Sequence, residues 1–101
     1  MELSVARHGG GRELVLHLAG GLDVSASASL RRAVPITTPA RLVLYLGGVT
    51  FIDSAGLRAL IECHLRQQHG GGLVLRGATE PVLRFFELCG LDDYFRTEEA
   101  G

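Results

Sequence analysis

The sequence contains no lysine, and all ten of its basic residues are arginine. Without lysine the chain has no P-loop lysine for nucleotide phosphates, no Schiff-base amine and no lysine general base. Its formal net charge is −1, which argues against nucleic acid or an anionic membrane as a partner. The composition therefore excludes several classes of enzyme and gives no basis for binding polyanions.

Long apolar runs are also missing. No run approaches the ~20 residues that span a bilayer, and the N-terminus carries Glu2 and alternates early, unlike a signal peptide. The two cysteines, Cys63 and Cys89, fall in apolar helical patterns, so we expect free thiols in the core of a protein from a reducing compartment. These features predict a cytoplasmic protein without membrane insertion.

The 101 residues predict a single domain over 1–101, with a polar tail from about 97. Periodicity and turn residues predict each element in turn. We expect strands at Leu3–Val5 and Leu14–Leu18, an exposed triple-glycine hairpin loop at Arg7–Arg12, a helix at Ser25–Val34, a central parallel strand at Arg41–Leu46, a helix from Ser54 to about Gln68, a strand at Leu73–Leu75, a helix starting at Thr79-Glu80-Pro81 and an edge strand within Asp92–Thr97.

This order, β-β-α-β-α-β-α-β, is typical of an α/β domain. It predicts a mixed, mostly parallel sheet of four to five strands with helices mainly on one face. In the helix from Ser54, the spacing of Arg58, Glu62 and Arg66 predicts two i,i+4 ion pairs on the exposed side. His64 falls on the opposite, core-facing stripe.

Two polar residues, Asp53 and Ser54, stand where the central strand turns into the long helix. Either side chain can cap the helix and have no other role. Their position is nevertheless the carboxyl edge of an open α/β sheet, where such folds place functional groups. Asp23 ends the neighbouring strand-to-helix turn. Two acids and an exposed hydroxyl at a helix N-terminus form a plausible acceptor for a phosphoryl group.

Other chemistry lacks the necessary spacing. A nucleophile elbow needs glycine two positions before Ser54, where this chain has Ile52. No motif ties an activating histidine to Ser54, whether His8, His17, His64 or His69. Cys63, His64, His69 and Cys89 have no zinc-binding spacing. We therefore expect no enzyme, no catalytic residue, no metal and no cofactor.

The stretch Phe51-Ile52-Asp53-Ser54-Ala55-Gly56-Leu57 resembles the signature of STAS domains, the fold of bacterial anti-sigma factor antagonists. The segment Leu18-Ala19-Gly20-Gly21-Leu22-Asp23 is similar to that family's strand-to-helix motif. The resemblance extends from about Leu3 to Phe95 and implies a single STAS-like domain. Two departures are Ala55, where many antagonists have a second hydroxyl residue, and a nearly absent C-terminal helix.

The resemblance implies that Ser54 is a phosphorylation site. The unphosphorylated form would bind an anti-sigma factor that is also a serine kinase, phosphorylation would release it, and a PP2C-type phosphatase would restore it. Sigma-factor-dependent transcription would be regulated, and the protein would be a monomer or weak dimer. The expected partner-binding residues are Gly21, Asp23, Ser25, Asp53, Ser54, Ala55, Gly56, Leu57, Arg58 and Glu62.

The sequence leaves two alternatives open. The same motif suits a STAS docking subunit of a lipid-transport ATPase complex, in which Ser54 is not phosphorylated. A small enzyme would need turnover that disappears when Ser54 is replaced, and the sequence offers no base for it.

Overall fold

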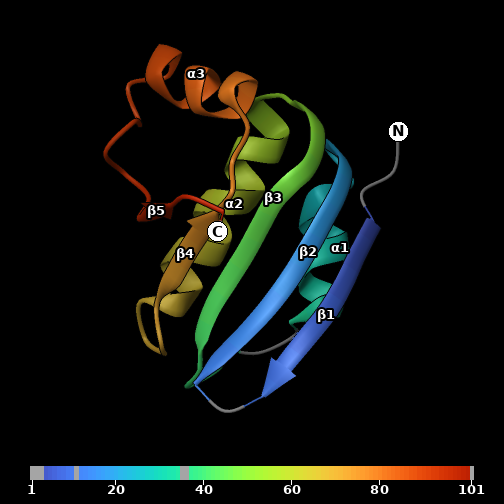
Figure 1. Ribbon diagram of the computed structural model, residues 1–101, viewed down its shortest axis with the longest axis vertical. Coiled ribbons are helices and arrows are strands. Elements are labelled where there is room, and N and C mark those ends of the chain that lie inside the picture. The colour runs from blue at the N-terminus through green and yellow to red at the C-terminus, as the bar shows by residue number, and fades with distance from the viewer. Residues whose placement is uncertain (1–3, 11, 35–36, 101) are drawn as a thin grey trace.

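In the computed structural model, strands and helices alternate in the predicted order (Figure 1). The structure describes residues 4–10, 12–34 and 37–100. Its elements are β1 (Ser4–Gly10), β2 (Glu13–Leu22), α1 (Ala26–Ala33), β3 (Arg41–Ile52), α2 (Ser54–Gln67), β4 (Leu73–Arg76), α3 (Glu80–Leu88) and β5 (Thr97–Glu98). The prediction of an α/β domain with a mixed sheet is confirmed.

The sheet has the strand order β1-β2-β3-β4-β5, with β1 antiparallel to β2 and every later pair parallel. β3 is therefore central, as predicted. α1 and α2 lie behind the same face of the sheet in Figure 1, and α3 lies at its upper end. Right-handed crossovers that always advance to the next strand place their helices on one face.

The core lies between the sheet and α1 and α2, because alternate strand residues point toward the helices. Burial of such a leucine contributes about 1.5–3 kcal/mol. The buried leucines of the strands are Leu14, Leu16, Leu18, Leu22, Leu42, Leu44, Leu46, Leu73 and Leu75, and α2 supplies Leu57, Leu60 and Cys63.

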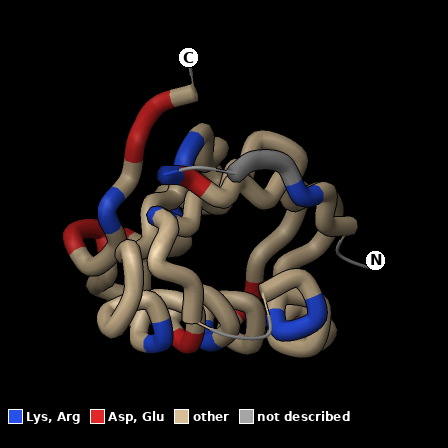
Figure 2. The backbone as a smooth tube through the Cα atoms, turned by 90° about the horizontal axis from the view of Figure 1, so that it is seen from below, with Lys and Arg blue, Asp and Glu red and all other residues tan. Residues whose placement is uncertain are grey.

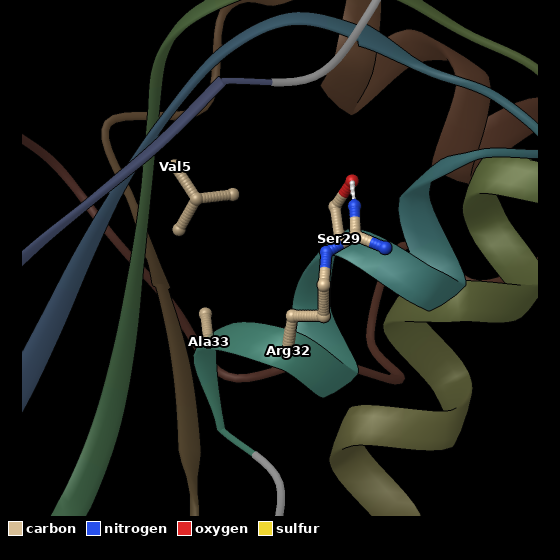
Figure 3. A pocket seen from close by; sticks show the side chains of 4 residues that line it. All are labelled: Val5, Ser29, Arg32 and Ala33. Carbon is tan, nitrogen blue, oxygen red and sulfur yellow. Dashed lines mark hydrogen bonds between the residues drawn. The ribbon is translucent and has the colours of Figure 1, made fainter.

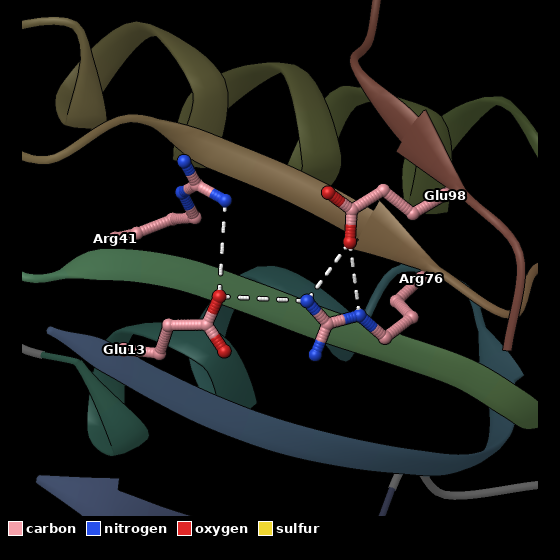
Figure 4. A network of polar contacts seen from close by, with 4 residues as sticks. All are labelled: Glu13, Arg41, Arg76 and Glu98. Atoms are coloured by element: carbon pink, nitrogen blue, oxygen red, sulfur yellow. Dashed lines mark hydrogen bonds and ion pairs between the residues drawn. The ribbon is translucent and has the colours of Figure 1, made fainter. Parts of the chain in front are cut away.

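Four charged residues form a network that crosses the sheet and reaches β5 (Figure 4). The guanidinium of Arg76 donates to Glu98 Oε1 at 2.8 and 3.1 Å. It also lies 3.5 Å from Glu13, which in turn lies 3.8 Å from Arg41. Because β5 has only two residues, the Arg76–Glu98 pair supplements its few backbone hydrogen bonds to β4.

The predicted hairpin between the first two strands is confirmed, but its loop is shorter than the predicted Arg7–Arg12. β1 continues to Gly10, and residues such as Arg7 pair with β2, opposite Leu16. Strand pairing uses backbone groups, which glycine also has, so glycine residues can continue a strand even though each one weakens it. Gly11, at the tip of the predicted loop, lies outside the described residues.

The predicted ion pairs along α2 were also wrong. Glu62 instead pairs with Arg31 of α1 at 2.8 Å and accepts a hydrogen bond from Ser27 Oγ at 3.1 Å. Arg66 donates to the carbonyl oxygen of Val34 at 3.1 Å, just beyond the end of α1. The neighbouring helix offers partners that include an otherwise unpaired terminal carbonyl, and these replace contacts within α2.

Two further differences concern the C-terminal part. Cys63 is buried, but Cys89 is exposed, because α3 ends at Leu88 and its buried face is formed by Val82 and Phe86. The last strand, β5, spans Thr97–Glu98, so it overlaps the predicted segment, Asp92–Thr97, only at Thr97.

None of the helices in the described part of the chain has the length and apolar character required to cross a membrane.

Candidate functional site

The long helix α2 is capped by Asp53, which directly follows β3. Asp53 has an extended backbone, with φ −127° and ψ −173°, and its Oδ1 accepts a hydrogen bond from the Gly56 N–H at 2.9 Å. This is the geometry of an N-cap, in which the side chain satisfies a backbone donor of the first turn. Of the two capping candidates in the sequence, Asp53 takes the role.

The start of α2 is packed tightly against the end of β2. The Asp53 N–H donates to the Leu22 carbonyl oxygen at 3.1 Å. A Cβ on Gly56 would lie 1.8 Å from that same oxygen, so only glycine allows the helix to approach this closely. The contact holds the two strand-to-helix turns side by side at the carboxyl edge of the sheet.

In the neighbouring turn, Asp23 is held by Ser25. Asp23 Oδ1 accepts hydrogen bonds from the Ser25 Oγ–H at 2.8 Å and the Ser25 N–H at 3.0 Å. Both hydrogen bonds lower the pKa of the Asp23 carboxyl below its ordinary value, and the bond from the Ser25 hydroxyl has the larger effect. Asp23 is therefore a fixed negative charge at neutral pH.

Ser54 occupies the first turn of α2 with its side chain exposed to solvent. Among the described residues, no hydrogen-bond partner of its hydroxyl is found. It borders a hollow of about 300 Å³ whose lining residues are Val24, Ser27, Ser54, Ala55, Arg58 and Glu62. Because Asp53 caps the helix, the Ser54 hydroxyl is free to react or to contact a partner.

The two charged residues of this hollow differ in their contacts. Glu62 is neutralised by Arg31, whereas Arg58 is exposed and forms no ion pair within the described chain. Val24 is 82% exposed at the same hollow. The surface thus combines an apolar side chain, a free hydroxyl and a free cation, which suits protein docking.

Two of the histidines considered as a base for Ser54, His17 and His64, contact other side chains. His17 lies in β2 with its ring 5.0 Å from that of Tyr45, and His64 packs on Tyr94 with ring centroids 4.8 Å apart. Neither residue lines the hollow at Ser54. Over the same described ranges, no three acidic, histidine or cysteine side chains gather into a possible metal site.

The structure brings most of the predicted site residues to one edge. Ser54 and Arg58 are exposed, while Gly21, Gly56 and Leu57 are buried and can support the surface only from beneath. The others, Asp23, Ser25, Asp53, Ala55 and Glu62, are half-buried. Sequence reasoning missed Val24, Ser27 and Arg31. The one sequence signal for these residues is the i,i+4 spacing of Ser27 and Arg31, which places both on the same face of α1.

A second hollow, of about 310 Å³, lies between β1 and α1 and is lined by Val5, Ser29, Arg32 and Ala33 (Figure 3). Its cation is already engaged, since Arg32 donates to Ser29 Oγ at 3.4 Å. Elsewhere, basic and acidic positions are distributed over several segments of the backbone (Figure 2). The hollow at Ser54 therefore remains the better candidate.

The chain is similar to known proteins of one family. The family model described as "Mlab, STAS domain" matches residues 5–97. The anti-sigma-B factor antagonist of Bacillus subtilis (strain 168) is 31% identical over 84 residues, which cover 80% of this chain and 77% of that protein. Its name describes a regulatory protein, in agreement with the prediction that this chain is not an enzyme.

Solved structures share the fold. An anti-sigma factor antagonist from Mycobacterium paratuberculosis is similar with a TM-score of 0.79 and 24% identity, over 96% of this chain and 86% of that one. Unphosphorylated SpoIIAA, an anti-sigma factor antagonist, has a TM-score of 0.74 and 20% identity, over 97% of this chain and 89% of that one. Phosphorylated SpoIIAA from Bacillus has a TM-score of 0.69 and 19% identity, over 97% of this chain and 92% of that one.

Proposed function

The chain belongs to the STAS domain family, and we propose that it is an anti-sigma factor antagonist whose binding is switched by phosphorylation of Ser54. The observation that carries the proposal is the division of roles at the start of α2. Asp53 caps the helix, and Ser54 keeps an exposed hydroxyl beside a hollow that a partner can cover. The antagonist from Bacillus subtilis supports the general role.

The partner in this proposal is an anti-sigma factor that is also a serine kinase. Its catalytic site would supply a nucleoside triphosphate. The Ser54 Oγ–H gives up its proton to a base of the kinase, Oγ bonds to the γ-phosphorus, and the nucleoside diphosphate leaves with the bond electrons. A PP2C-type phosphatase would hydrolyse the ester and return the hydroxyl. Both reactions belong to the cytoplasm, where we expect the protein.

Phosphorylation would alter charge more than structure. A phosphate adds about −1.5 to −2 charges at Ser54, near the fixed charge of Asp23. If the partner presents an acid ~5 Å from the phosphate, the repulsion is about 3 kcal/mol per unit charge at an effective dielectric of about 20. That energy corresponds to roughly a hundredfold weaker binding, enough to dissociate a micromolar complex.

The first test compares binding of the kinase by the wild type, Ser54→Ala and Ser54→Asp. We expect the purified anti-sigma factor kinase to bind wild type and Ser54→Ala but not Ser54→Asp, and to transfer one phosphate to the wild type only. Gln68→Glu is the matched control, because it adds one negative charge at the exposed far end of α2. Retained binding by Ser54→Asp, with no phosphate on the wild type, would contradict the proposal.

The second test is made on the protein from its native host. Mass spectrometry should find a fraction of the molecules carrying phosphate on Ser54. The alternative is a docking subunit of a lipid-transport ATPase complex, in which Ser54 is never modified. The motif Asp53-Ser54-Ala55-Gly56 suits this role as well, and the description of the matched family model, "Mlab, STAS domain", names no antagonist. Co-purification with an ATPase, unaffected by Ser54→Asp, would establish that alternative instead.

A further inference from the structure

The two exposed polar side chains of the hollow at Ser54 are one helical turn apart. Ser54 and Arg58 both line the hollow, and at i,i+4 their Cβ atoms are about 5–6 Å apart. An anion four residues before a cation is the favourable order for a pair on a helix. The hollow therefore contains an acceptor hydroxyl and a cation that can reach a group attached to it.

Arg58 has no ion-pair partner within α2, because Glu62 already binds residues of α1. Along α2, Glu62 is the acid that should pair with Arg58, but it is bound by Arg31 at 2.8 Å and by Ser27 Oγ at 3.1 Å. Arg31 and Ser27 come from α1, so the packing of the two helices leaves the guanidinium of Arg58 unpaired among the described residues. The acids of the two strand-to-helix turns, Asp23 and Asp53, accept backbone hydrogen bonds.

We propose that Arg58 is the counter-ion of the phosphate on Ser54, so that phosphorylation removes this free cation from the docking surface. The proposal rests on the proposed function for the existence of the phosphate and goes beyond it in assigning Arg58. In the unmodified protein, Arg58 is available to an acidic side chain of the anti-sigma factor. In the phosphorylated protein, the phosphate occupies Arg58, and its remaining negative charge faces the partner.

The test measures the second ionisation of the phosphate and needs neither kinase nor partner. Phosphoserine is incorporated at position 54 during translation, and the phosphorus NMR shift is followed against pH. A neighbouring cation favours the dianion and lowers the titration midpoint. We expect Arg58→Gln to raise that midpoint by about 0.3 pH units, as a helical i,i+4 pair implies.

Two variants control for other effects. Arg58→Lys keeps the charge and should keep a midpoint close to that of the wild type. Arg84→Gln removes an exposed arginine from α3 and should also leave it unchanged. Equal midpoints in wild type and Arg58→Gln, within about 0.1 pH units, would overturn the assignment of Arg58 without affecting the phosphorylation switch. Absence of phosphate on Ser54 in the host would contradict the switch and leave the NMR result intact.

Discussion

The Cα of Gly56 lies against the carbonyl group of Leu22, so closely that an added Cβ would come within 1.8 Å of the oxygen and 2.3 Å of the carbon. This contact joins the start of α2 to the end of β2. It explains in steric terms why the stretch from Asp53 to Leu57 contains glycine. It also places the turn of Asp23 beside that of Ser54.

Replacing Gly56 by alanine tests this contact. Helix propensity alone would make Gly56→Ala stabilising by about 1 kcal/mol. The clash with the backbone of Leu22 should outweigh that gain, so we expect a net loss of about 1–3 kcal/mol in the free energy of unfolding. Urea denaturation measures it, and increased stability would show that α2 does not approach β2 in this way.

The cap of α2 gives a second prediction. Asp53→Ala removes the acceptor of the Gly56 N–H and should lower the free energy of unfolding by about 1 kcal/mol. Ser54→Ala removes only an exposed hydroxyl and should change it by less than about 0.5 kcal/mol. If matched denaturation curves showed a larger loss of stability for Ser54→Ala than for Asp53→Ala, Ser54 would be the capping residue. Its hydroxyl would then not be free to react.

Acid should weaken the attachment of β5. The hydrogen bonds from Arg76 lower the pKa of Glu98 below its ordinary value of 4.5. A lowered pKa means that the folded state binds this proton less readily than the unfolded state. The stabilisation is therefore complete above pH 4.5 and decreases as pH falls through the lower pKa of the folded protein.

Glu98→Gln isolates that contribution. The variant should be less stable than wild type at neutral pH, and the difference should narrow as pH falls below 4.5, because protonation removes the same charge. The exposed neighbour Glu99 forms no ion pair within the described chain, so Glu99→Gln serves as the control. A stability difference independent of pH between 2 and 6 (approximate limits of the acid range) would exclude the proposed role of the Arg76–Glu98 pair.

The two thiols should differ in reactivity. Burial raises the pKa of Cys63 to about 11, so both access and the thiolate form are suppressed in the folded protein. Cys89 is exposed. Native protein should react rapidly at Cys89 alone with an alkylating reagent, and unfolded protein at both positions, as read by mass spectrometry. Rapid labelling of native Cys89→Ser would show that Cys63 is accessible.

Local patterns in the sequence were sufficient for most of the fold. Alternating leucines such as Leu14, Leu16 and Leu18 predicted a half-buried strand, and the prediction is confirmed because period-two burial is a property of the strand itself. The length of the hairpin loop was mispredicted, because a local glycine pattern does not decide where strand pairing ends. Glycines in β1 do not interrupt the strand, because pairing with β2 satisfies the backbone whatever the side chain.

By itself, the sequence determined the order of the elements, the central strand and the position of Asp53 and Ser54 at a helix start. The tertiary structure decided how these residues are used. Asp53 takes the cap, and Glu62 pairs with Arg31, which is 31 positions away in sequence, so Arg58 is left without an ion pair in the part of the chain that the structure describes. Such choices depend on which distant segments lie within hydrogen-bond distance, and side-chain spacing along one helix carries no information about its neighbour.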